Sequence, residues 1–121
     1  MYQIDLRYVF KSLHFKGGLK LIEKILGIDR GELIDVDGFF AIHLWNEYLL
    51  NTNKKALNTL IAYNVEDTIN LETLMHIGYN LKGKTSGFQN FKKLEIPPKP
   101  KHHYLPENEL ISRLKMDLKY Y

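Results

Sequence analysis

The longest helical pattern in the chain runs from Lys54 to about Asn80, and it limits how much of the protein can form a sheet. Its apolar members recur at three- and four-residue spacings: Leu57, Leu60, Ile61, Leu71, Leu74, Met75 and Ile77. Three further helices are predicted over residues 18–27, 39–51 and 107–120. A chain of 121 residues that contains these four helices has room for few strands.

Only one segment has the composition of a strand. Residues 2–8 are rich in β-forming side chains, and Gly17 and Gly18 separate this segment from the first predicted helix. A strand without neighbours exposes its backbone groups, which favours self-association. We therefore expect a mainly α protein with at most one short N-terminal strand.

The predicted helix 39–51 is apolar on nearly all sides. Phe40, Leu44 and Tyr48 form one stripe, and other large apolar side chains flank it. We expect this helix to be central to the core. Trp45 is expected to lie in that core rather than to stack on a nucleic-acid base.

Composition excludes several classes of protein. The chain has no cysteine, which rules out disulfides and Cys-based zinc sites and is typical of an intracellular protein. No segment approaches the roughly 18 apolar residues of a membrane span. Asp5 and Arg7 interrupt the N-terminal apolar stretch, unlike a signal peptide. We expect a soluble, cytoplasmic protein with no membrane partner.

Charge is unevenly distributed along the chain. Residues 1–81 hold eight Lys and Arg against ten Asp and Glu, a net charge of −2, whereas residues 82–121 hold nine against four, a net charge of +5. We expect a folded domain over 1–81, a basic Pro-containing linker over 82–106 and a C-terminal helix over 107–121. The basic tail could attract the phosphates of nucleic acid, and a solvated Lys-rich tail is the competing interpretation.

A tyrosine and an aspartate lie four positions apart within the long helical pattern, in LIAYNVEDTINLETL (60–74). Residues i and i+4 of an α-helix share a face, so Tyr63 and Asp67 can serve one site. The simplest interpretation of such a pair is structural, with the phenol in the core and the carboxylate solvated or capping a helix.

The surrounding segments add to this pair. IDLR, GLKLIEKILGIDR, DGFFAIHLWNEYL and ALNTLIAYNVEDTINLETL follow one another in that order. The succession resembles the C-terminal part of the ribonuclease-H-like DEDDy 3′-to-5′ exonucleases, in particular the predicted exonuclease branch related to the nuclease domain of family B DNA polymerases. The resemblance covers roughly residues 3–80, and the family's third motif, Tyr-x-x-x-Asp, matches Tyr63 and Asp67.

The resemblance implies a fold and a chemistry. The fold would be the helical C-terminal portion of a ribonuclease-H-like α/β domain. Asp67 would be a ligand of one of two Mg²⁺ or Mn²⁺ ions, and Tyr63 would orient the water that attacks the phosphodiester. Two such ions about 4 Å apart can activate water and stabilise the leaving oxygen.

The family's first two acidic motifs are absent from this chain. No aspartate is followed by a glutamate two positions on, and we expect Asp5, Asp35 and Asp37 to be structural or solvated. One carboxylate holds two divalent ions poorly. The resemblance therefore implies a truncated, split or degenerate metal-dependent 3′-to-5′ exonuclease that acts on or binds nucleic acid, is inactive alone, and forms a homodimer or pairs with a missing upstream half.

Two alternatives from other functional classes stay open. IEKILGIDRGELI has the rhythm of a helix-turn-helix in which Asp29 caps a DNA-recognition helix, although residues 29–38 carry one arginine against four acids. The other alternative is a non-catalytic helical interaction protein whose basic tail is the binding element.

Overall fold

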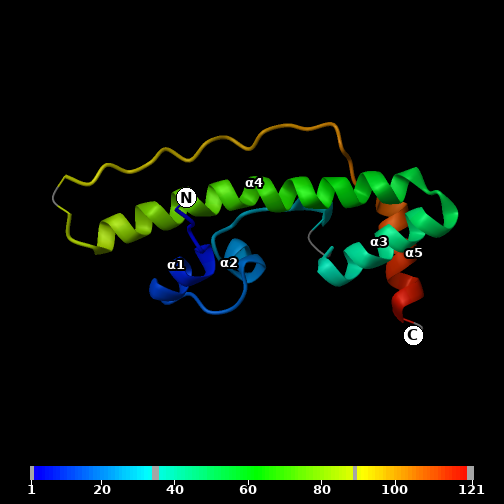
Figure 1. Cartoon of the computed structure of the whole chain (residues 1–121), viewed down its shortest axis with the longest axis horizontal. Helices are drawn as coiled ribbons and strands as arrows, with labels where there is room; N and C mark the ends of the chain where they lie inside the picture. The colour runs from blue at the N-terminus through cyan, green and yellow to red at the C-terminus, as the bar shows by residue number, and fades with distance from the viewer. Residues whose placement is uncertain (1, 34–35, 89, 120–121) are drawn as a thin grey trace. The chain divides into compact units, whose positions relative to one another are not determined.

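The computed structural model describes residues 2–33, 36–88 and 90–119, and this described part contains helices and no strand. The elements are α1 (Leu6–Ser12), α2 (Leu19–Ile25), the 3₁₀ turn η1 (Gly31–Leu33), α3 (Gly38–Asn51), α4 (Lys54–Thr85) and α5 (Asn108–Lys119) (Figure 1). The mainly α class is confirmed, as are the helices predicted near 18–27, 39–51, 54–80 and 107–120.

The strand predicted at residues 2–8 is wrong, because helix α1 begins at Leu6. Asp5 is the N-cap of α1, and its carboxylate accepts a hydrogen bond from the Arg7 backbone N–H at 3.0 Å. A helix pairs its backbone groups within the segment, whereas a strand needs a neighbour. No neighbouring strand exists in the described part of the chain, so the β-forming composition of this segment is overridden.

The stop predicted for the next helix at Gly27 is confirmed. The Ile28 N–H donates to the Glu23 carbonyl at 2.9 Å, and the Gly27 N–H donates to the Lys24 carbonyl at 3.1 Å. These two bonds form a Schellman motif, which places its C′ residue in the left-handed region. Gly27 has φ +77°, a conformation that glycine adopts without strain.

The chain divides into two compact units. The first unit comprises Met1–Asp29 and Thr68–Pro100. Its core is formed by Phe10, Ile22 and Leu74, and apolar side chains from α1, α2 and the C-terminal half of α4 surround them. The Phe10 and Phe15 rings meet edge to face with centroids 5.4 Å apart.

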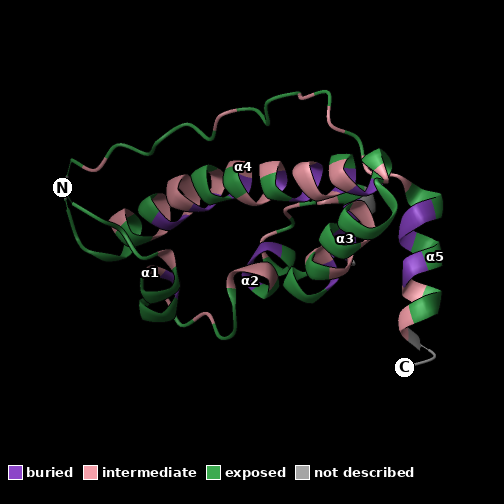
Figure 2. Ribbon diagram, turned by 45° about the vertical axis from the view of Figure 1, so that its right-hand side comes forward, coloured by how far each residue is buried: buried purple, intermediate pink, exposed green. Residues whose placement is uncertain are grey.

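The second unit comprises Arg30–Asp67 and Lys101–Tyr121. Its larger core contains Leu33, Val36, Phe40, Leu44, Ala56, Ala62, Tyr63, Leu110, Ile111 and Leu114. Figure 2 shows the buried residues of α5 on part of that helix and exposed residues on the rest. The sequence-based division at residues 81 and 106 stays a prediction.

Helix α3 is only partly buried, which corrects the expectation for Trp45. Phe40 and Leu44 are buried, but Trp45 is 44% exposed and Ile42 is 57% exposed. Asp37 starts the helix, because its carboxylate accepts a hydrogen bond from the Phe40 N–H at 2.8 Å. A helix that is apolar all round needs cover on every side, and the second unit covers only the side that carries Phe40 and Leu44.

Helix α4 runs without interruption for 32 residues, so no break separates Tyr63 from Asp67. It begins where the Asn53 side chain accepts a hydrogen bond from the Lys55 N–H at 3.1 Å. No helix in the described ranges is both long enough and apolar enough to cross a membrane.

Two polar contacts attach α5 within the second unit. At its start, the Glu107 N–H donates to the Thr59 hydroxyl of α4 at 3.1 Å. Further along, the Arg113 guanidinium donates to Glu47 of α3 at 2.7 Å. Asn51 and Asn53 also donate to this carboxylate, at 3.1 and 3.3 Å.

The core position Leu44 gives a direct test of this packing. Leu44 is fully buried, so Leu44→Ala should lower the free energy of unfolding by about 2–5 kcal/mol through lost burial and a residual cavity. Denaturant unfolding followed by circular dichroism measures the change. Met116→Ala, at an exposed position of α5 away from the apolar side of α3, is the control, expected within about 0.5 kcal/mol of the parent. Equal losses at both positions would contradict the placement of α3.

Glu47 gives a pH-dependent prediction. The hydrogen bond from Arg113 holds the pKa of Glu47 below its usual 4.5, while burial acts in the opposite direction and Asn53 and Asn51 lower it further. A lowered folded pKa means that the ionised carboxylate stabilises the fold above the unfolded pKa, and that this stability is lost as the pH falls through the folded pKa.

We therefore expect Glu47→Gln to lower stability at pH 7 by about 0.5–1 kcal/mol, since Arg113 is half exposed, and to have little effect at pH 3. Thermal unfolding at the two pH values measures this, with exposed Glu95→Gln as the control. A deficit of the same size at pH 3 would indicate that packing, and not charge, explains the contact.

Candidate functional site

The two residues of the Tyr-x-x-x-Asp motif lie one turn apart on α4 but in different surroundings. Tyr63 is 6% exposed and belongs to the core of the second unit. Asp67 is more accessible, with 40% of its side chain exposed. Asn64, between them in sequence, is exposed. The helix therefore presents the carboxylate toward solvent and packs much of the tyrosine against apolar neighbours.

Asp67 is paired with a cation of this chain. Its Oδ1 atom lies 2.5 Å from a guanidinium nitrogen of Arg30, whose side chain is only 7% exposed. A guanidinium that is nearly buried needs negative partners, because the loss of hydration is costly. Asp67 supplies one such partner, so one of its oxygens is already engaged.

A tight turn positions Arg30 for this contact. Gly31 follows it with φ +57°, a left-handed conformation, and begins η1. The Leu33 N–H then donates to the Arg30 carbonyl at 3.1 Å, and Leu33 is buried in the core. The turn thus fixes the backbone directly after Arg30, whose guanidinium reaches Asp67.

A second acidic residue of α4 is more deeply buried than Asp67. Glu66 precedes Asp67, and its side chain is 12% exposed. Its Oε1 atom lies 3.6 Å from Nε2 of His102, which comes from the segment before α5. Glu66 and Asp67 therefore have different partners, as expected for successive helical residues about 100° apart around the axis.

The other aspartates considered from sequence act as caps where they are described. Asp5 caps α1 and Asp37 caps α3, so the expectation that these two carboxylates are structural is confirmed. Asp35 lies outside the described residues. Neither capping carboxylate is available to the candidate site as an unengaged ligand.

The residues around Asp67 do not fit a pair of divalent ions. A two-metal site needs several carboxylate oxygens, and here one carboxylate already contacts a guanidinium. Within residues 2–33, 36–88 and 90–119, no three His, Asp or Glu side chains are grouped closely enough to hold a metal ion. The described residues alone therefore do not form the metal centre that the resemblance implies.

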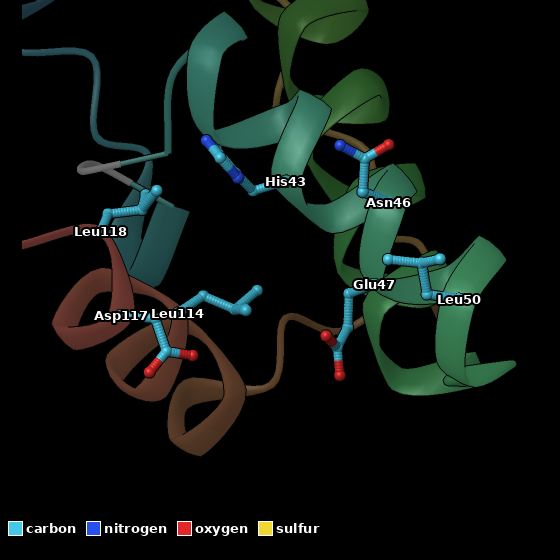
Figure 3. Close-up of a pocket in the computed structure, with 7 residues that line it drawn as sticks. All are labelled: His43, Asn46, Glu47, Leu50, Leu114, Asp117 and Leu118. Carbon is cyan, nitrogen blue, oxygen red and sulfur yellow. The ribbon is translucent and has the colours of Figure 1, made fainter. Parts of the chain in front are cut away.

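An open groove of about 710 Å³ lies between α3 and α5 in the second unit (Figure 3). Its lining includes His43, Glu47, Leu114 and Asp117. Glu47 is already bound by Arg113, and neither Tyr63 nor Asp67 lines the groove. The groove is thus separate from the motif predicted from sequence.

The sequence prediction missed the two basic residues that pair with carboxylates of α4. Arg30 lies 37 positions before Asp67, and His102 lies 36 positions after Glu66. Helical periodicity relates residues three or four apart and carries no information at such separations. Only the arginine's position beside a turn glycine could have indicated a fixed side chain.

Comparison with known proteins gives a family but no individual relative. Residues 1–79 match the family RNase_H_2, described as RNase H superfamily. No curated protein and no solved structure matches the chain significantly. The matched segment contains both Tyr63 and Asp67. Because the match spans more than half of the 121 residues, the chain belongs to this family of the RNase H superfamily.

Proposed function

We propose that this protein is a nuclease-like protein that acts on or binds nucleic acid, and that it becomes a metal-dependent 3′-to-5′ exonuclease only with acidic residues from outside residues 1–121. Within this proposal Asp67 is the metal-binding residue of this chain, and Tyr63 orients the attacking water. Mg²⁺ or Mn²⁺ is the expected ion. The absence of cysteine supports a cytoplasmic location.

One observation carries the proposal. The family match includes the Tyr63 and Asp67 pair, yet the guanidinium of Arg30 lies 2.5 Å from the Asp67 carboxylate. A bound cationic side chain at this position competes with a metal ion for the same oxygen. This supports a site that is inactive in the isolated chain and needs further carboxylates before metal ions can outcompete the arginine.

The helix-turn-helix alternative has little support from the geometry. Its recognition helix would have to begin after Asp29, where η1 forms a single 3₁₀ turn. The next α-helix, α3, begins only at Gly38 and is uncharged on the side that carries Ile42 and Trp45. A groove-reading helix needs cationic side chains for the phosphates. A non-catalytic interaction protein remains the alternative that activity measurements decide.

The exposed side of α3 supports self-association of the isolated chain. Phe39, Ile42, Leu49 and Leu50 are each more than half exposed, and none of the side chains on this side is charged. An uncharged apolar face is complementary to a copy of itself, as a two-fold interface requires. We propose a homodimer through this face when no other partner is present.

The first prediction of this proposal concerns activity. The isolated chain should release no nucleotides from a labelled single strand with Mg²⁺ or Mn²⁺. Adding a polypeptide that carries a strand with Asp-x-Glu and a later aspartate, if one is encoded beside this chain, should produce cleavage. In that mixture Asp67→Asn should abolish cleavage, and Tyr63→Phe should reduce it by leaving the water less well oriented.

Two results would contradict this assignment. Robust cleavage by the isolated chain that is lost in Asp67→Asn would mean that its own aspartates suffice. Cleavage that survives Asp67→Asn in the mixture would remove Tyr63 and Asp67 from the site.

The second prediction concerns assembly. Light scattering should give twice the 14.3 kDa chain mass at micromolar concentrations, and the double variant Ile42→Glu, Leu49→Glu should give the single-chain mass. Lys54→Glu, Lys55→Glu on α4 is the control with the same number of added acids. A 14.3 kDa mass for the parent chain across this range would exclude the homodimer.

A further inference from the structure

The end of α4 is tied to the segment that follows it. Figure 1 shows the chain reversing direction after α4, and Asn80 makes two hydrogen bonds across this reversal. Its Nδ2 donates to the Leu94 carbonyl at 2.9 Å, and its Oδ1 accepts from the Leu94 N–H at 2.7 Å. One side-chain amide thus satisfies both backbone groups of a residue 14 positions away. We call residues 79–88 and 90–94 the lysine loop.

Contacts of an aromatic ring also stabilise the lysine loop, in addition to the hydrogen bonds of Asn80. The Phe91 ring packs so closely on Gly83 that any larger side chain at this position would force the ring to move. The rings of Tyr79 and Phe91 have centroids 5.3 Å apart. Tyr79 remains 49% exposed, and Phe88 is 73% exposed. The loop therefore presents two exposed aromatic rings, of which Tyr79 packs against Phe91.

The lysine loop also concentrates positive charge. Lys82 and Lys84 lie on its helical arm, and Lys92 and Lys93 lie on the returning arm. All four are exposed, and no Asp or Glu occurs between residues 73 and 94. The lysines on the two arms repel each other. The contacts of Asn80 and Phe91 hold the arms together against this repulsion. An anionic ligand would relieve that repulsion.

From these contacts we infer that the lysine loop is a binding site for single-stranded nucleic acid, with the lysines on the phosphates and Tyr79 and Phe88 stacking on bases. The inference rests on the proposed function and deepens it, because it names the surface that holds the substrate strand. Exposed rings among lysines match single strands, whose bases are free to stack. A membrane-bound helix would need a broad apolar face, and these rings are separated by charged residues.

Binding is measured by fluorescence anisotropy of a labelled oligothymidine with the full chain and without divalent ions. Four phosphate contacts predict a slope of log K against log salt of up to about −3. Lys92→Gln, Lys93→Gln should weaken binding about tenfold and make the slope less steep by about 1.4. The matched control, Lys54→Gln, Lys55→Gln, removes two exposed lysines from the other end of α4 and should leave binding nearly unchanged.

The stacking rings are tested separately. Tyr79→Ala should weaken binding about fivefold or more without changing the salt slope, and duplex DNA of equal length should bind more weakly than the single strand. Phe88→Ala gives a second test at a more exposed ring, which keeps the measurement valid if Tyr79→Ala fails to fold.

Three outcomes would overturn the inference: equal weakening by the two double-lysine variants, binding unaffected by loss of either ring, or tighter binding to vesicles rich in phosphatidylserine than to the oligonucleotide. Failure of the proposed function is distinguishable from these. Binding that depends on Lys92 and Lys93 in a protein that never cleaves, even in the completed mixture, would reject the exonuclease and keep the lysine loop. Cleavage that depends on Asp67 with binding independent of the lysines would do the reverse.

Discussion

The fold depends on the unbroken helix α4, because this element contributes side chains to both hydrophobic cores. Ala56, Ala62 and Tyr63 belong to the core of the second unit, and Leu74 belongs to that of the first. A long helix in water gains most of its stability from such packing rather than from intrinsic propensity. Its middle turns also bury polar groups, since Glu66 and Asn70, taken as whole residues, are 9% and 1% exposed. Buried polar groups need partners for hydrogen bonds or for charge. The basic side chains that supply such partners must therefore lie at fixed positions beside the helix.

The pair between Arg30 and Asp67 is the clearest example of this constraint. The arginine is nearly buried and the carboxylate is not, so the arginine loses more hydration than the aspartate on pairing. A divalent ion at Asp67 would have to compete with a guanidinium that the fold already holds in place. Additional carboxylates would raise the negative potential at this point and favour the ion of higher charge. Under the proposed function, this competition is the reason that Asp67 needs further carboxylates before it binds an ion.

The helices could be predicted from sequence because their signals are local. Apolar spacing located α2, α3, α4 and α5, and Gly27 marked a helix end that the Schellman bonds confirm. The errors came from interactions between distant parts of the chain. Residues 2–8 have β-forming side chains, but no strand in the described part pairs with them, and Asp5 caps a helix instead. Trp45 lies on an apolar helix with cover on one side only. Likewise the motif could be found by spacing, whereas its partner Arg30 could not.

Charge separates the part of the chain that matches the family from the part that follows it. Residues 1–81 carry a net charge of −2, so their net charge does not attract a negatively charged nucleic-acid strand. Residues 82–121 carry +5, and the contacts of Asn80 and Phe91 hold four of those lysines on two adjoining arms. The attraction for phosphate that we propose is therefore assigned to the segment beyond residue 79, where the family match ends. Without fixed contacts, four lysines on a solvated tail would separate to reduce their repulsion. The positive potential that a nucleic-acid strand meets at any one place would then be lower. The Asn80 amide and the ring on Gly83 oppose that separation, so the local potential depends on side chains that carry no charge themselves.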